Sequence, residues 1–252
     1  MAQRATPLQG TRLGRLIGAE NAAVSGVVLL LPSGAENSTR RPSPLAVSAA
    51  RTLGRRVVRE GRAEGLVGHV VHYGRRGWNG PDALPARDAR WAVAEVVRRY
   101  GDVPVCLAGI DMGGRAALHA ADHPAVNSVL ALAPWLPEDD VAVAPEPVKQ
   151  LSGRRVLIVH GTNDERTDPE LSFRFAERVK KANRDTCRFE VHSDGHGLHQ
   201  HRAEVAALAA DFVLGTLFGR GFSRPLTDAL AAPPPLGLRM PLASGFGRSL
   251  RG

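Results

Sequence analysis

The sequence contains few cysteines and few aromatic residues. Only two of its 252 residues are cysteine, and aromatic residues make up 5% of the chain. Cys106 lies inside the apolar run Val103 to Ala108, where a buried, reduced thiol is the expected state. Cys106 and Cys187 do not have the spacing of a metal site or a redox motif. A cysteine-based metal or redox centre is therefore not expected.

Long hydrophobic runs are also absent. A membrane-spanning helix needs roughly 18 apolar residues, whereas the longest apolar run, Val27 to Leu31, has the length of a buried strand. The N-terminal stretch that begins with Met1 and Ala2 contains no apolar segment of the kind found in a secretory signal peptide. We expect a cytoplasmic protein that does not interact with a membrane.

Lysine is the third scarce residue. The chain has three lysines, so 33 − 3 = 30 of its basic residues are arginine, and the net charge is +8. These arginines are scattered over several predicted helices and loops without interleaved aromatic residues. Charge alone gives only non-specific attraction to nucleic acid, so nucleic acid is not the expected partner. We expect a small-molecule substrate, and a homodimer remains an open option.

The chain does contain a regular alternation of strand and helix patterns. Hydrophobic residues form 43% of the sequence, and the length suits one large α/β domain. Short β-branched runs predict buried strands, and longer segments with helical apolar spacing predict helices. Strands are expected at 24–31, 66–73, 103–110, 126–133, 155–160 and 187–192, and helices at 45–60, 86–100, 112–121, 147–151, 169–181 and 201–217.

This alternation predicts a doubly wound, mostly parallel sheet of the α/β class, with functional groups beyond the carboxyl ends of its strands. Residues 1–22 are polar and rich in Gly and Arg, and they predict a loose arm or one edge strand. Residues 23–218 are expected to form the folded domain. Residues 219–252, with three consecutive prolines, show little apolar periodicity and predict a disordered or surface-wrapping tail.

The most informative segment lies directly between a predicted strand and a predicted helix. It reads Gly109-Ile110-Asp111-Met112-Gly113. It resembles the nucleophile elbow G-x-S-x-G of the α/β-hydrolases, with Asp111 in the serine position. The flanking glycines allow the strand and the helix to approach closely, and the helix N-terminus favours an ionised carboxylate.

Two further loops extend the resemblance. The loop 160–164 follows the fifth predicted strand, reads HGTND and resembles the family's acid-bearing loop. The loop 193–197 follows the sixth, reads SDGHG and resembles its histidine loop. The order nucleophile, acid, histidine is that of the family. The resemblance covers residues 24–217 and implies an α/β-hydrolase fold whose catalytic residues are Asp111, Asp164 and His196.

The resemblance also implies an oxyanion hole made from two backbone N–H groups. One belongs to Met112, which follows the nucleophile position. The other is expected at Gly34, with Ser33 as the alternative, because Pro32-Ser33-Gly34 stands where the family has H-G-x.

Three residues are candidates for substrate binding. Trp78 and Trp135 follow strand ends and are expected to wall an open pocket above the sheet. Arg115 is either an anchor for an anionic substrate or a solvent-facing helix residue.

The acidic assignments have alternatives that the sequence leaves open. Asp111 could merely cap the helix that follows it, because Asp is favoured at that position. Asp164 competes with Glu165 and Asp168. Asp168 precedes Pro169, which is typical of a helix N-cap followed by proline.

The histidine assignment is open as well. His196 competes with His192, His199 and His201. No spacing among these histidines is typical of a metal site, so neither a metal nor another cofactor is expected.

An aspartate at the elbow changes the implied chemistry. Serine must lose its proton to a histidine, whereas an ionised aspartate can attack an sp3 carbon directly and form an ester. Haloalkane dehalogenases, haloacid dehalogenases of this fold and epoxide hydrolases work in this way. The resemblance therefore implies a hydrolase acting on a small organic substrate of the ester, halide or epoxide class, with Asp111 as nucleophile or base.

The sequence departs from those enzymes in one respect. Those enzymes carry a cap domain at the place that corresponds to the segment between Pro134 and Arg155. In this sequence the segment has only about twenty residues, which is little more than a crossover connection requires. The short linker resembles compact, lidless esterases and dienelactone-hydrolase-like proteins, which use Ser or Cys. A non-hydrolytic cyclase or lyase, and an inactive or Ser-to-Asp-substituted serine hydrolase, remain alternatives.

Overall fold

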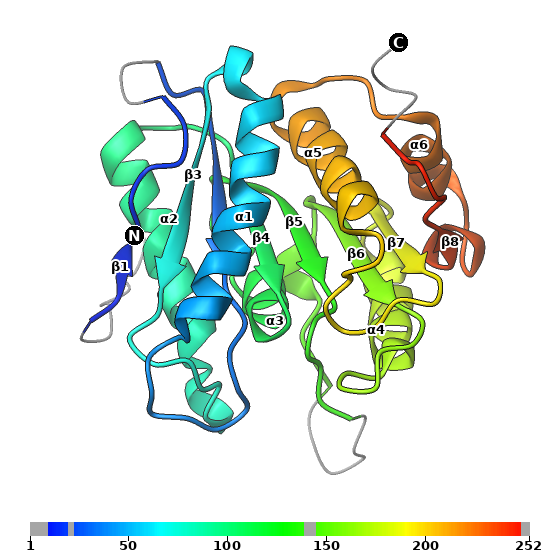
Figure 1. Cartoon of the computed structure of the whole chain (residues 1–252), viewed down its shortest axis with the longest axis horizontal. Coiled ribbons are helices and arrows are strands. Elements are labelled where there is room, and N and C mark those ends of the chain that lie inside the picture. Colours follow the sequence, from blue (N-terminus) through cyan, green and yellow to red (C-terminus); the bar gives the residue numbers. More distant parts are fainter. Residues whose placement is uncertain (1–9, 20–22, 139–144, 248–252) are drawn as a thin grey trace.

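The computed structural model describes residues 10–19, 23–138 and 145–247. Within these ranges one sheet of eight strands runs through the molecule in the order β1-β3-β2-β4-β5-β6-β7-β8 (Figure 1). The pairing of β1 with β3 is antiparallel and the other pairings are parallel. The strands are β1 (Arg12–Leu13), β2 (Gly26–Leu31), β3 (Leu66–His72), β4 (Val105–Ile110), β5 (Val126–Leu132), β6 (Arg155–Gly161), β7 (Thr186–Val191) and β8 (Met240–Pro241).

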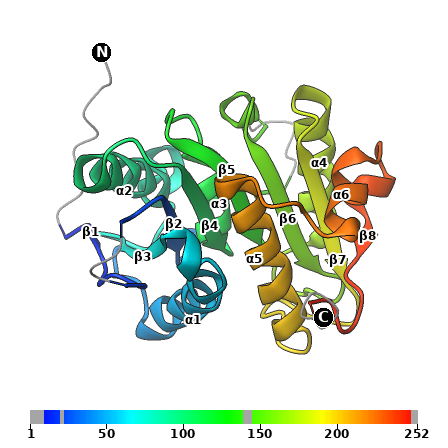
Figure 2. The ribbon, with the colours of Figure 1, turned by 90° about the horizontal axis from the view of Figure 1, so that it is seen from above.

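Helices cover both faces of the sheet, as Figure 2 shows. One hydrophobic core lies between the sheet and α2, α3 and α4, and the other lies between the sheet and α1, α5 and α6. The helices are α1 (Pro44–Glu60), α2 (Leu84–Tyr100), α3 (Met112–His119), α4 (Pro169–Ala182), α5 (Arg202–Phe218) and α6 (Arg224–Ala231), with short 3-10 turns at η1 (Arg62–Glu64), η2 (Gly80–Asp82), η3 (Lys149–Leu151) and η4 (Leu236–Leu238). The expected α/β fold with a doubly wound, mostly parallel sheet is confirmed.

The local sequence explains why the elements begin where they do. All six residues of β2 are buried, as expected for a central strand covered on both faces. Ser43 caps α1 by accepting a hydrogen bond from the Ala46 N–H, and Pro44 occupies the first turn. Asp168 caps α4 in the same way, so the N-cap interpretation of this residue is correct.

The described part of the segment between β5 and β6 contains no cap domain. This described part forms only η3. The carboxyl ends of β4, β5 and β6 are therefore open to the loops that follow them, and these loops carry the candidate site. No helix in the described ranges is long and apolar enough to cross a membrane.

The expectation of disorder after residue 219 is wrong for the described residues, which extend to 247. They form α6, η4 and β8, and β8 adds a parallel edge strand beside β7 (Figure 1). Leu226 and Leu238 are fully buried. The buried Lys180 donates to the carbonyl of Leu230, and Arg188 donates to that of Leu238. The folded domain therefore continues past the predicted boundary at 218, and of the two predicted states the surface-wrapping one describes this segment.

The N-terminal arm follows the second of its two expected forms. Residues 12–13 form the short edge strand β1, paired with β3. Residues 1–9 and 20–22 lie outside the described ranges. Both cysteines are buried and free.

Candidate active site

Asp111 occupies a sharp turn between the end of β4 and the start of α3. Its backbone has φ 55° and ψ −120°, a region that a non-glycine residue adopts only at an energetic cost. The turn is held by hydrogen bonds from the Asp111 N–H to the Leu132 carbonyl at 2.9 Å and from the Trp135 N–H to the Asp111 carbonyl at 3.2 Å. Such a strained turn presents its side chain at the catalytic edge of the sheet.

The glycines on either side of this turn are sterically required. A Cβ added to Gly109 would lie 2.0 Å from the Gly113 carbonyl oxygen. One added to Gly113 would lie 2.1 Å from the Leu31 carbonyl oxygen. Any larger residue would push α3 away from the sheet, so the glycine spacing seen in the sequence matches the geometry of the turn.

The helix-cap alternative for Asp111 does not account for its side chain. Asp111 stands at the N-terminal end of α3, yet its carboxylate makes no capping hydrogen bond to the helix. The residue is 1% exposed. A buried carboxylate held in a strained backbone without a capping role is typical of a functional position.

The structure brings Asp111, Asp164 and His196 together from three loops. His196 Nδ1 lies 2.8 Å from Asp164 Oδ2, and His196 Nε2 lies 3.7 Å from Asp111 Oδ1. Asp164 follows β6 and His196 follows β7, as the sequence predicted. The histidine therefore stands between the two carboxylates, with one ring nitrogen directed to each.

The Asp164 carboxylate accepts several hydrogen bonds. Its carboxylate accepts from the backbone N–H groups of Arg166 and Thr167, both at 2.9 Å, and from the Thr167 hydroxyl at 2.7 Å. His160 Nε2 lies 3.1 Å away. Burial alone would raise the pKa of Asp164, but the hydrogen bonds from His160, His196 and Thr167 outweigh it and hold the pKa far below its ordinary range. Asp164 is thus a fixed anion.

The competing acids do not reach this position. Glu165 is exposed, and Asp168 caps α4. His160, which sequence reasoning did not assign, supports Asp164 from behind. It is fully buried, and its Nδ1 lies 2.9 Å from the Ser172 hydroxyl.

The competing histidines are also placed elsewhere. His192 is exposed at the end of β7. His199 Nδ1 accepts from Arg202, and His201 contacts Asp194. Among the residues that the structure describes, no three His, Cys, Asp or Glu side chains are arranged to hold a metal ion.

Arg166 is a site residue that the sequence did not reveal. Its guanidinium Nη2 lies 3.4 Å from Asp111 Oδ2, and 60% of its side chain is exposed. It follows Asp164 by two residues, and no motif marks it in the sequence. Burial raises the pKa of Asp111, and the positive charges of Arg166 and His196 act against that rise.

The two predicted oxyanion positions lie next to each other. A Cβ added to Gly34 would lie 3.0 Å from the Met112 side chain and 2.4 Å from the Arg76 carbonyl oxygen. The loop after β2 therefore packs directly on the start of α3, and only glycine fits at position 34. The Met112 and Gly34 N–H groups are therefore close enough in the fold for the predicted oxyanion hole, which stays a prediction.

Trp78, Trp135 and Arg115 form a separate cluster. The Arg115 guanidinium lies 3.9 Å from the Trp78 ring centre and 5.0 Å from that of Trp135. It pairs with Glu146, which also pairs with His119. Burial alone would raise the pKa of Glu146, but hydrogen bonds from His119 and Arg115 lower it to about 2.

The cluster corrects three sequence-based expectations. Trp78 is 5% exposed and belongs to the core, and Trp135 is only partly exposed. Arg115 is 8% exposed and already has an anionic partner, so it neither faces solvent nor offers a free charge to a substrate. None of the three lines the cavity that contains His196.

The cavity beside His196 has a volume of about 550 Å³, a size that suits a small organic molecule. It lies between α1 and α5. Leu53 from α1 and Val205 from α5 contribute to an apolar wall, and Arg166 and His196 lie at the catalytic end. Figure 1 shows α1 and α5 side by side on one face of the sheet.

Comparison with known proteins supports this assignment of the fold. Residues 132–217, which are 86 of the 252 residues, match the prolyl oligopeptidase family. A serine hydrolase homologue from Coxiella burnetii is similar in structure, with 15% identity, a TM-score of 0.55 and coverage of 82% of this chain and 99% of the other. The chain has the α/β-hydrolase fold. The family match includes the loops that carry Asp164 and His196, but it begins after the turn that carries Asp111.

Two further solved structures are similar to this chain. The Pyrococcus furiosus esterase Pf2001 has 15% identity and a TM-score of 0.57, with 79% of this chain and 83% of the other covered. A serine hydrolase without a lid from Xanthomonas campestris has 15% identity and a TM-score of 0.54, with 81% and 87% covered. No curated protein matches the chain.

Proposed function

We propose that the chain is a hydrolase in which Asp111 attacks carbon, His196 activates water and Asp164 orients His196. The observation that supports this most strongly is the position of a buried carboxylate on the strained elbow, 3.7 Å from a histidine nitrogen whose other ring nitrogen is 2.8 Å from Asp164. A carboxylate at this point needs no base to become nucleophilic. The proposed substrates are small organic molecules with a halide, an epoxide or an ester.

The first step forms a bond between an Asp111 carboxylate oxygen and an sp3 carbon of the substrate. The bond from that carbon to the halide, the epoxide oxygen or the ester oxygen breaks, and the halide or the oxygen keeps the electron pair. Arg166 lies 3.4 Å from Asp111 and faces the cavity, so its positive charge can stabilise the departing anion. The product of this step is an ester on Asp111.

The second step hydrolyses that ester. His196 Nε2 accepts a proton from a water molecule, and the oxygen of that water attacks the ester carbon of Asp111. The N–H groups of Met112 and Gly34 would stabilise the negative oxygen that forms on this carbon. Collapse breaks the ester C–O bond, the alkoxide takes the proton from His196 and leaves as the alcohol, and Asp111 loses the remaining proton to solvent and becomes a carboxylate again. The fixed anion of Asp164 favours the protonated His196 that exists during this step.

A second candidate function makes Asp111 a proton acceptor. Burial raises its pKa, which moves a carboxyl towards the range useful for general base catalysis. A lyase, a cyclase or a hydrolase that deprotonates water directly would use the group in this way. Such an enzyme forms no ester on Asp111, and this difference separates it from the first proposal.

The test is intact-mass spectrometry of the His196→Ala variant after incubation with panels of haloalkanoates, epoxides and esters. The proposed mechanism predicts a trapped adduct on Asp111, because the variant lacks the base that activates water. Asp111→Asn should form no adduct and should not turn over substrate. Turnover by the parent without any adduct in His196→Ala would favour the proton-transfer function.

A further inference from the structure

The cavity beside Asp111 and His196 is lined by both arginines and apolar side chains. Three arginines line it: Arg56 from α1, Arg166 from the loop after β6, and Arg202 from α5. None of its described lining residues is Asp or Glu. The remaining wall is mostly apolar, with Leu53, Leu132 and Val205 among its members.

Arg56 and Arg202 differ from Arg166 in their described partners. Arg166 is paired with Asp111. Arg202 donates to the Nδ1 atom of His199 at 2.9 Å, which positions its guanidinium without neutralising it. Within the described part of the chain, neither Arg56 nor Arg202 has a carboxylate within ion-pair distance.

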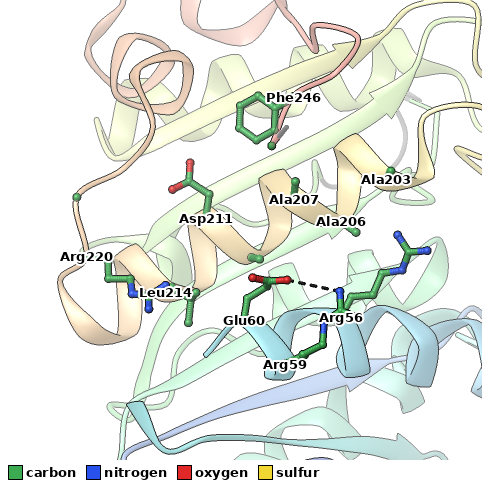
Figure 3. Close-up of a pocket in the computed structure, with 13 residues that line it drawn as sticks. Arg56, Arg59, Glu60, Ala203, Ala206, Ala207, Asp211, Leu214, Arg220 and Phe246 are labelled. Atoms are coloured by element: carbon green, nitrogen blue, oxygen red, sulfur yellow. Dashed lines mark hydrogen bonds and ion pairs between the residues drawn. The ribbon is translucent and has the colours of Figure 1, made fainter. Parts of the chain in front are cut away.

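The neighbouring cavity provides an internal comparison. It has a volume of about 480 Å³, shares Arg56 and Ala206 with the first, and continues the space between α1 and α5 (Figure 3). There carboxylates accompany the arginines, because Glu60 and Asp211 line it together with Arg56, Arg59 and Arg220, and Arg59 pairs with Glu60 at 3.5 Å. Figure 3 shows the Arg56 side chain pointing away from Glu60, towards the part of α5 that carries Ala203 and Ala206.

An exposed apolar residue marks the mouth of the charged cavity. Leu45, in the first turn of α1, is 83% exposed although it lines this cavity. A ligand with an apolar body would cover Leu45 and the apolar wall of the cavity. Burying this apolar surface would favour binding through the hydrophobic effect. Its negative group would form charge-assisted hydrogen bonds with the free guanidinium groups.

We propose that the substrate of this site is an amphipathic anion. Its reacting carbon lies beside Asp111, its apolar body lies against the wall between α1 and α5, and its carboxylate binds Arg56 and Arg202. This inference rests on the proposed function only for the position of the reacting carbon. The selection of an anion follows from the unbalanced charge of the cavity.

The test is a binding measurement that does not require turnover. Octanoate and octanol share an apolar chain and differ in charge, so their affinities for the full-length protein can be compared by calorimetry. We expect octanoate to bind at least about ten-fold more tightly, since hydrogen bonds to charged groups contribute roughly 1.5–3 kcal/mol. The Arg56→Gln/Arg202→Gln double variant should lose this preference while its affinity for octanol stays unchanged.

Matched variants keep the test specific. Arg55→Gln removes an exposed arginine one position away and should bind octanoate like the parent. Arg56→Lys should retain part of the preference. Loss of octanoate binding in Arg59→Gln but not in the double variant would place the anion in the neighbouring cavity and overturn the proposal, as would equal affinities for octanoate and octanol in the parent.

The outcome is distinguishable from failure of the proposed function. Asp111→Asn should bind octanoate at least as tightly as the parent, because it removes a nearby negative charge. Arginine-dependent binding without any adduct on Asp111 would leave the substrate class standing and refute the mechanism. Adducts from neutral substrates, combined with no preference for octanoate, would support the mechanism and refute the proposed substrate class.

Discussion

At the scale of single residues, the account depends on the ionisation of Asp111. Burial raises its pKa, so the reactive carboxylate is present above that raised value and is lost as the pH falls through it. Arg166 lowers the same pKa. Arg166→Ala should therefore move the acid limb of the pH–rate profile to higher pH, and Arg87→Ala, an exposed arginine on α2, should leave it in place. An acid limb that is identical in Arg166→Ala and the parent would contradict the role given to Arg166.

Glu146 forms ion pairs with Arg115 and His119, which both belong to α3. Its pKa is lowered to about 2, so its ion pair stabilises the fold above its ordinary value near 4.5, and that stabilisation is lost as the pH falls towards 2. Glu146→Gln leaves a buried guanidinium without an anion, which costs about 3 kcal/mol of unfolding free energy at neutral pH.

Urea denaturation of Glu146→Gln at several pH values checks this expectation. The loss should shrink as the pH approaches 2, because the parent carboxylate is then protonated as well. The exposed Glu165→Gln serves as the control and should change stability by less than about 0.5 kcal/mol. A loss of stability that does not depend on pH would show that the charge of Glu146 is not what matters.

At the scale of elements, the segment α6–η4–β8 is part of the domain. Leu226 is fully buried, whereas Leu236 in the same segment is 68% exposed. Leu226→Ala should cost about 2–5 kcal/mol and Leu236→Ala almost nothing. Thermal unfolding of the two variants measures the difference. If both leave the melting temperature unchanged, the segment does not dock as described.

This segment also shows where sequence reasoning fails. Its helix is short, its prolines interrupt the apolar pattern, and its docking depends on carbonyl groups that accept from Lys180 and Arg188. Backbone acceptors leave no signal in the sequence. Arg188 further contacts Ser172, which contacts His160 and through it Asp164. A buried chain of polar contacts thus connects the segment to Asp164.

At the scale of the whole molecule, the fold and the convergence of Asp111, Asp164 and His196 were predictable, and the surroundings of these three residues were not. Strand and helix positions follow from hydrophobic periodicity, and Asp111, Asp164 and His196 follow from motifs located just after strands. Arg115 was misread because its partner Glu146 lies 31 residues away, beyond any local pattern. Arg166 was missed because only the fold of the loop after β6 brings its side chain close to Asp111.

The residues around position 111 can be tested for their competence in ester hydrolysis. Asp111→Ser places a hydroxyl at the elbow of a site that retains His196 and Asp164, in a fold shared with serine hydrolases. This variant should hydrolyse activated esters such as 4-nitrophenyl acetate, and Asp111→Ser/His196→Ala should not. Inertness of Asp111→Ser towards every ester tested would show that the oxyanion positions around Met112 and Gly34 are not competent.

The central claim is that Asp111 forms an ester with the substrate and that water then hydrolyses this ester. Turnover in water enriched in heavy oxygen tests it most directly. In the proposed mechanism, water attacks the ester carbon of Asp111, so the heavy oxygen enters the carboxylate first and reaches the product only in later turnovers. Mass spectrometry of the peptide containing Asp111 should therefore show the label after repeated turnover. Label that appears in the product while Asp111 stays unlabelled would contradict the account.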